Sequence, residues 1–147
     1  MLYNEIKNIL VNKGWFDSES EEFIWFNSEG ESFAVVKIDQ GKELKSLCVI
    51  TPPHFFEDDL IPDIFIVAAG VNNHHSSARV SIHSHIYGNG MKEGDNMLGF
   101  EFHAPKSCLG DIEKALESAV EEILLLADDF FNEMDNSFTK KDESEEE

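Results

Sequence analysis

Histidines and cysteines are the residues of this 147-residue chain whose types and spacing could do chemistry. His83 and His85 lie two apart in the alternating stretch 78–87, ARVSIHSHIY, which is typical of a strand. Successive strand side chains point to opposite faces, so both imidazoles leave the same face. With a third ligand such as His103 or Glu101, the pair could bind zinc, nickel or copper. No spacing closes a four-ligand shell, so we expect polar side chains on an exposed sheet face and no metal cofactor.

Cys108 is the second candidate for chemistry, because it lies five residues after His103 and next to a predicted helix. A helix N-terminus can lower the pKa of a thiol, but a nucleophilic cysteine also needs a base that a third group orients. The sequence identifies no such third group, and its carboxylates are too dispersed to select an acid/base pair. We therefore expect no enzyme. The enzyme alternative would use His83, His85 and Cys108.

Net charge is the strongest global feature, at −19 from 30 acidic and 11 basic residues. Such a surface repels phosphate backbones and anionic lipids, so we expect neither a nucleic-acid nor a membrane partner, and a basic protein is favoured. Cys48 and Cys108 are too few for a disulfide framework and suit a reducing compartment. No signal peptide and no run near ~20 apolar residues is visible. These features predict a cytoplasmic protein.

The first half of the chain predicts a helix followed by a three-stranded meander. Apolar residues recur at helical spacing over residues 2–13, and Gly14 supplies a C-terminal stop. Short polar turns then separate three apolar runs, as in antiparallel hairpins. The predicted strands are residues 23–26, 32–38 and 44–51, and the acidic stretch 17–22 is predicted as a loop.

Residues 62–70 are compatible with either a helix or a strand. The partly β-branched run FIVAA favours a strand, whereas Pro62 followed by Asp63 suits the first turn of a helix. We favour the helix, because it also fits the alternation of elements along the chain.

A hairpin follows, made of residues 77–87 and 97–104 and joined by a glycine- and charge-rich loop. Leu98, Phe100 and Phe102 alternate with polar residues, so one face of this hairpin is predicted to be buried and the other exposed. The exposed face would carry Arg79, His83, His85, Tyr87, Glu101 and His103.

The last predicted element is a long amphipathic helix over residues 109–134, with Asp111 favourably placed at its positive N-terminal end. The stretch TKKDESEEE closes the sequence and has the composition of a disordered segment. We therefore predict one α+β domain, residues 1–136, and a disordered acidic tail, residues 137–147. The predicted element order is α-β-β-β-α-β-β-α, an antiparallel sheet of about five strands packed by the N-terminal and the long C-terminal helix.

Three segments of the chain carry a resemblance to a known superfamily. They are the opening Ile6-Lys7-Asn8-Ile9-Leu10 with Gly14-Trp15, the middle Val71-Asn72-Asn73, and the closing Ile112-Glu113-Lys114-Ala115-Leu116. In their order and pattern they resemble the YbjN-like and type III secretion chaperone-like superfamily. The resemblance implies an acidic, non-enzymatic and often dimeric protein that binds another polypeptide on its sheet and helix surfaces.

Two protein-binding functions follow from these expectations. The first is a bacterial immunity protein, whose acidic surface would steer it to a basic toxin and cover the toxin's active site. The second is a secretion chaperone that holds an effector segment against apolar strand faces, for which a homodimer is one expected state. The residues expected to contact the partner are Arg79, His83, His85, Tyr87, Glu101, His103 and Glu117.

Overall fold

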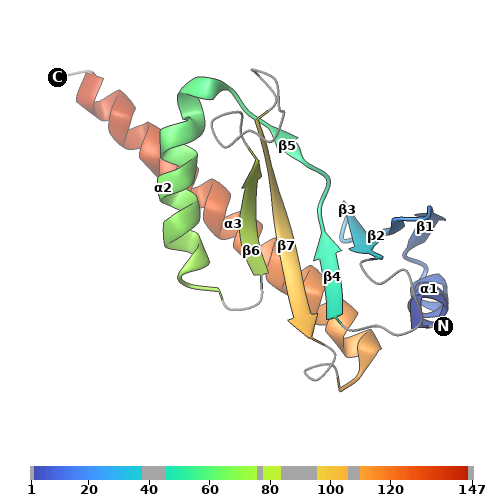
Figure 1. Ribbon diagram of the computed structural model, residues 1–147. Coiled ribbons are helices and arrows are strands. Elements are labelled where there is room, and N and C mark those ends of the chain that lie inside the picture. Colours follow the sequence, from blue (N-terminus) through green and yellow to red (C-terminus); the bar gives the residue numbers. More distant parts are fainter. Residues whose placement is uncertain (1, 38–45, 76–77, 84–95, 106–109, 146–147) are drawn as a thin grey trace.

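The protein is an α+β structure built on one antiparallel sheet (Figure 1). The computed structural model describes residues 2–37, 46–75, 78–83, 96–105 and 110–145, with only the backbone for Leu2, Asp58, His83 and residues 137–145. The strands are β1 Phe16–Glu19, β2 Phe23–Ser28, β3 Glu31–Val36, β4 Ser46–Ile50, β5 His54–Phe55, β6 Ala78–His83 and β7 Met97–Pro105. The helices are α1 Leu2–Lys13, the 3-10 turn η1 Asp58–Leu60, α2 Ile61–Asn72 and α3 Ile112–Glu145.

Each strand of the sheet pairs antiparallel with its neighbours, in the order β1, β2, β3, β4, β7. One side of β7 pairs with β4 and, further along, with β5, and its other side pairs with β6. Between β4 and β5, the Thr51 hydroxyl accepts a hydrogen bond of 3.1 Å from the Phe100 N–H. This side-chain bond maintains the ladder where Pro52 and Pro53 lack N–H donors.

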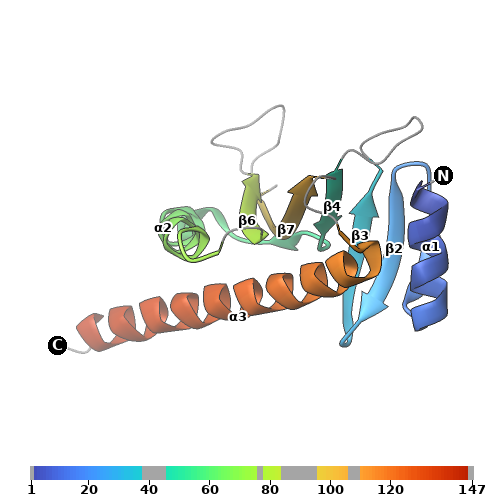
Figure 2. The same cartoon turned by 90° about the horizontal axis from the view of Figure 1, so that it is seen from below.

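The helices lie on one face of the sheet, where the core forms (Figure 2). α3 crosses this face, α2 lies beside β6, and α1 lies at the β2 end. Alternate β7 residues, among them Phe100 and Phe102, are buried against the helices. Buried aromatic and aliphatic side chains of this kind each stabilise the fold by about 1.5–3 kcal/mol. The core residues of α3 are Leu116, Ala119, Val120, Ile123, Leu126, Phe130 and Met134.

The main sequence predictions for the fold are confirmed. α1 ends at Gly14, whose φ of 75° is the left-handed conformation that glycine adopts easily. The uncertain middle segment is the helix α2, with proline in its first turn. β6 and β7 form the predicted hairpin, and Asp111 caps α3 by accepting a bond from the Glu113 N–H at 3.0 Å.

The structure corrects the predicted sheet and the last helix. Residues 16–19 form β1 instead of starting a loop, because pairing with β2 holds a polar segment that has no strand pattern of its own. β5 is a second additional strand, of only two residues. The backbone of α3 is helical through Glu145, beyond the predicted end at Met134, and the domain boundary at residue 136 stays a prediction.

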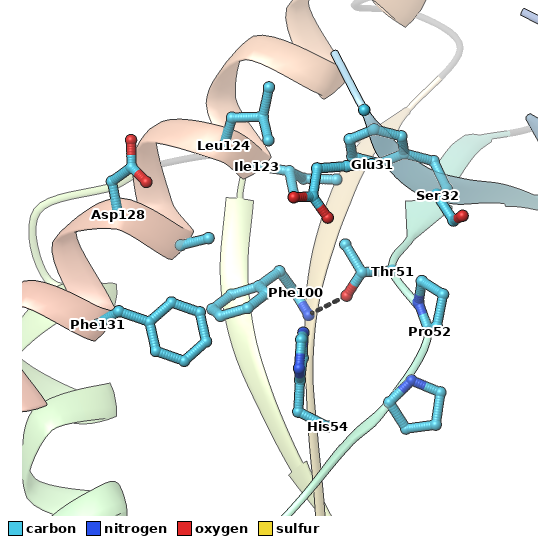
Figure 3. A pocket seen from close by; sticks show the side chains of 14 residues that line it. Glu31, Ser32, Thr51, Pro52, His54, Phe100, Ile123, Leu124, Asp128 and Phe131 are labelled. Carbon is cyan, nitrogen blue, oxygen red and sulfur yellow. Dashed lines mark hydrogen bonds between the residues drawn. The ribbon is translucent and has the colours of Figure 1, made fainter. Parts of the chain in front are cut away.

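The β2–β3 connection is a two-residue hairpin turn in which Glu29 and Gly30 have φ values of 55° and 77°. Positive φ at both central residues defines the turn whose twist matches that of the strands. It places Glu31, the first residue of β3, at the end of the hairpin nearest to α3 (Figure 3). None of the described helices combines enough length with enough apolar residues to span a lipid bilayer.

The outer edge of β6 is covered by one side chain of α2. The Asn72 amide donates to the Val80 carbonyl oxygen at 3.3 Å and accepts from the Val80 N–H at 2.8 Å. Both backbone groups of Val80 on this edge are thus paired, as a further strand would pair them.

Candidate functional site

The sheet face opposite the helices carries part of the predicted binding surface. Arg79 of β6 and Glu101 of β7 are cross-strand neighbours. On β7, the Glu101 carboxylate lies 3.0 Å from Nε2 of His103. Cys48 of β4 lies directly opposite His103, with its Sγ 3.7 Å from the same nitrogen. The sheet therefore brings a thiol, an imidazole and a carboxylate together.

The geometry of this thiol, imidazole and carboxylate does not suit nucleophilic catalysis. An activated cysteine needs a ring nitrogen that accepts its proton while the other ring nitrogen donates to an orienting group. Here the contacts of Cys48 and Glu101 both converge on Nε2 of His103. Burial, and secondarily the charge of Glu101, raise the pKa of the Cys48 thiol to about 12. The thiol therefore stays protonated at neutral pH.

The other predicted site residues are placed as follows. His83 lies in β6 opposite Met97, and only its backbone is described. His85, Tyr87 and Cys108 lie outside the described residues, so the metal and thiol sites proposed for them stay predictions. Within the described part of the chain, no three His, Cys, Asp or Glu side chains are grouped to hold a metal ion.

Glu117 lies on the other side of the sheet, in α3, where it forms an ion pair with Lys13 of α1. Lys13 also lies 3.6 Å from Glu113 and stands over the Trp15 ring, 4.7 Å from its centroid. The predicted contact residues are therefore divided between two faces: Arg79, Glu101 and His103 on the open sheet face, and Glu117 on the helical side.

A pocket that the sequence did not indicate opens on the helical side, between α3, the β2–β3 turn and the bend from β4 to β5 (Figure 3). Its volume is about 390 Å³. Its apolar interior includes Phe100 and Ile123, both buried, and Phe131, which is 43% exposed. The lining residues are Gly30, Glu31, Ser32, Phe33, Thr51, Pro52, Pro53, His54, Phe100, Ile123, Leu124, Ala127, Asp128 and Phe131.

Aromatic contacts hold the wall of the pocket. The Phe131 ring meets Phe100 edge-on at 5.8 Å between centroids and Phe130 at 5.4 Å. The His54 ring meets Phe131 at 5.8 Å and Phe100 at 6.0 Å. Such edge-to-face arrangements are favourable, so a partly exposed phenylalanine keeps a defined position.

Four acidic and two apolar residues lie along one flank of α3, next to this pocket. Their spacing of four and three residues places them in one line along the helix. All are exposed except Leu124, which is half-buried, and in Figure 2 the side of α3 away from the sheet is uncovered. We call this line the acidic–apolar stripe: Glu117, Glu121, Leu124, Asp128, Phe131 and Asp135.

Comparison with solved structures gives an informative similarity. No protein-family model matches the sequence, and no curated protein matches it. Among solved structures, the chain is similar to YbjN from E. coli, a proposed transcription regulator, with a TM-score of 0.59 and 8% sequence identity. The similarity covers 84% of this chain and 87% of that one. At this identity the likeness shows the fold alone. The chain therefore has a YbjN-like fold, which confirms this part of the predicted resemblance. The likeness to type III secretion chaperones stays a prediction.

Proposed function

We propose that this chain is a non-enzymatic protein that binds a basic protein partner, and specifically an immunity protein that neutralises a basic toxin. The observation that carries the proposal is the acidic–apolar stripe of α3. A stripe of this composition offers apolar contact area and carboxylates on the same exposed line. Interfaces commonly combine a few large apolar anchors with a polar surround that sets specificity.

The charge of the stripe has a cost in the free protein. Glu117 and Glu121 are one helical turn apart, and like charges at this spacing destabilise a helix by about 0.2–0.5 kcal/mol, a cost that the ion pair of Glu117 with Lys13 reduces. The net charge of −19 adds repulsion throughout the molecule. A basic partner would relieve this repulsion and would be attracted from a distance, which raises the association rate.

The secretion-chaperone function is the alternative, and one structural detail opposes a common form of it. Some chaperones bind a client by adding one of its segments as a strand at a sheet edge. On the β6 edge, Asn72 already pairs with both backbone groups of Val80. A chaperone role would therefore use either the other edge of the sheet, at β1, or the open sheet face around Arg79, Glu101 and His103. Both this role and a homodimer stay predictions.

The test of the proposal is co-expression with the protein encoded next to this chain, which the proposal expects to be basic. We expect a complex that can be isolated and relief of the growth inhibition that the neighbour causes on its own. The double variant Glu121→Lys with Asp128→Lys should weaken the complex about tenfold or more, mainly by slowing association at low salt.

The matched control is Glu21→Lys with Glu57→Lys, which changes the charge equally at exposed positions away from α3. This control should retain most of the affinity. Binding that is unchanged between low salt and ~0.5 M salt would contradict an electrostatic interface, because screening at that salt shortens the reach of exposed charges to a few ångströms. A neighbour that is neither basic nor bound would contradict the immunity role itself.

A further inference from the structure

We infer that the pocket between α3, the β2–β3 turn and the β4–β5 bend receives an arginine side chain of the partner. The inference rests on the proposed function and names the chemistry of one contact within it. Three observations carry it: the size of the pocket, the carboxylates at its rim, and the aromatic wall that Phe131 provides.

The size of the pocket favours a single long side chain. Its volume of about 390 Å³ is near the lower end of the range, roughly 300–1,000 Å³, that small-molecule sites occupy. A helix or strand of a partner would not fit inside. The partly exposed apolar residues Leu124, Ala127 and Phe131 offer a surface for a methylene stem, which long basic side chains bury while their charged ends stay near the rim.

The rim favours a cation. Glu31 lies at the start of β3 and Asp128 on α3, and both side chains are exposed. In Figure 3 the Glu31 carboxylate is turned inward over the pocket. Neither carboxylate has an ion-pair partner within the described residues. A positive group bound between them would therefore gain attraction without displacing a cation of the described residues.

The aromatic wall selects arginine over lysine. Phe131 is 43% exposed, and its ring is available beside the rim carboxylates. A planar guanidinium stacks on aromatic rings and is less strongly hydrated than an ammonium group, so it leaves water at a lower cost. An arginine can place its stem on the apolar floor, its plane against Phe131, and its N–H donors toward Glu31 and Asp128.

The pocket is also preorganised, which reduces the entropy lost on binding. The turn at Glu29 and Gly30 fixes the start of β3 and therefore the position of Glu31. The Thr51–Phe100 hydrogen bond of 3.1 Å fixes the opposite side of the pocket.

The experiment is a titration of the full chain, labelled with nitrogen-15, with N-acetyl-arginine amide, followed by NMR. We expect concentration-dependent shifts that centre on the amides of Glu31, Thr51, His54 and Phe131. N-acetyl-norleucine amide has a similar stem without the charge and should bind more weakly. N-acetyl-lysine amide should lie between the two. Glu31→Gln and Asp128→Asn should each weaken arginine binding about two- to fivefold, as expected for exposed charge pairs.

Glu21→Gln is the control, since it removes an exposed carboxylate outside the pocket and should not change the titration. Shifts elsewhere on the surface, equal binding of the norleucine probe, or no effect of Glu31→Gln and Asp128→Asn would overturn the inference. If the basic neighbour binds the chain while the arginine probe does not reach the pocket, the inference fails and the proposed function stands. If the probe binds as expected and no basic protein does, the pocket stands and the proposed function fails.

Discussion

The side-chain amide of Asn72 pairs with both backbone groups of Val80, at 2.8 Å to its N–H and 3.3 Å to its carbonyl oxygen. β6 is the last strand on its side of the sheet in the described part of the chain, so this amide takes the place of the next strand. An exposed strand edge is a template for pairing with another chain. One side chain thus joins α2 to the sheet and occupies this edge at Val80.

Replacing Asn72 with aspartate should destabilise the protein. A carboxylate can still accept from the Val80 N–H, but it cannot donate to the Val80 carbonyl and would repel it. The free energy of unfolding should fall by about 1–3 kcal/mol, as for other partly buried groups left unpaired. Urea denaturation measures this loss, and Asn73→Asp is the control, because it makes the same change at an exposed neighbour. Equal losses in both variants would mean that charge at the end of α2 is the cause.

Glu29→Asn should stabilise the protein. Glu29 has a positive φ of 55°, which costs most side chains about 1–2 kcal/mol, while asparagine tolerates it and Asn-Gly is the preferred pair for this turn. We expect a gain of about 0.5–1 kcal/mol, visible as a higher melting temperature. Glu21→Asn removes the same charge at an exposed position with ordinary φ. A gain of the same size there would show that relief of charge repulsion, and not the turn, is responsible.

The ionisation of Cys48 should lower the stability of the folded protein at alkaline pH. The unfolded thiol loses its proton near its ordinary pKa of 9.0, whereas burial holds the folded pKa at about 12. Between these values the unfolded state has released a proton that the folded state keeps. The stabilising contribution is therefore complete below pH 9 and is lost as pH rises toward 12. The free energy of unfolding should fall more steeply with pH in the wild type than in Cys48→Ala between pH 9 and 12. The same pH dependence in both proteins would contradict the assignment.

The same burial predicts slow labelling of the thiol. In a Cys108→Ser variant, a disulfide reagent at pH 8 should modify Cys48 only as fast as the protein opens, because the thiolate is scarce in the folded state. Adding urea should accelerate the reaction sharply. Rapid labelling of the native protein, at the rate of a free cysteine, would show that the thiol is accessible and activated.

Lys13→Met should weaken the contact between α1 and α3. Lys13 pairs with Glu117 and Glu113 and stands over Trp15, and its side chain is 17% exposed. Methionine retains the apolar stem, so the loss isolates the charge. It should reach about 0.5–1.5 kcal/mol and shrink at high salt. Lys7→Met is the matched control: Lys7 lies over Phe16 at 5.2 Å and 3.8 Å from Glu19, but its side chain is 38% exposed, so the loss should be smaller.

The ionisation of Lys13 makes the stability that this ion pair contributes depend on pH. The hydrogen bond to Glu117 is the main cause that raises the pKa of Lys13 above its ordinary 10.5. The folded state therefore keeps a proton that the unfolded state has lost above that value. Stability from this pair should be complete below pH 10.5 and decline above it. The decline should be absent in Lys13→Met, and a decline of the same size in that variant would contradict the assignment.

Local patterns in the sequence were sufficient for the elements whose signals lie within a few residues. Pro62 and Asp63 predicted the start of α2, and the alternation of Leu98, Phe100 and Phe102 predicted the buried face of β7. β1 was missed because only its pairing with β2 makes it a strand. β5 was missed because two residues after a pair of prolines carry no strand period.

The candidate site was less accessible to prediction than the fold. Cys48 and His103 are 55 residues apart, and they meet only because the register of β4 and β7 places them opposite each other. The pocket joins the β2–β3 turn, the β4–β5 bend and the middle of α3, so no single stretch of sequence describes it. The sequence does not indicate that Glu31 lines a pocket, because its position there depends on the β2–β3 turn.

α3 covers the apolar face of the sheet, and it follows every strand of that sheet in the chain. During synthesis, the strands therefore leave the ribosome before their cover exists. Their apolar side chains, including Phe26, Phe33 and Phe100, stay exposed until the helix around Ile123 emerges. Sheets that wait for distant contacts are slow to form and prone to aggregation. This order of synthesis delays the folding of the sheet until α3 has emerged, and a truncation before α3 should leave the apolar face of the sheet exposed and lower solubility.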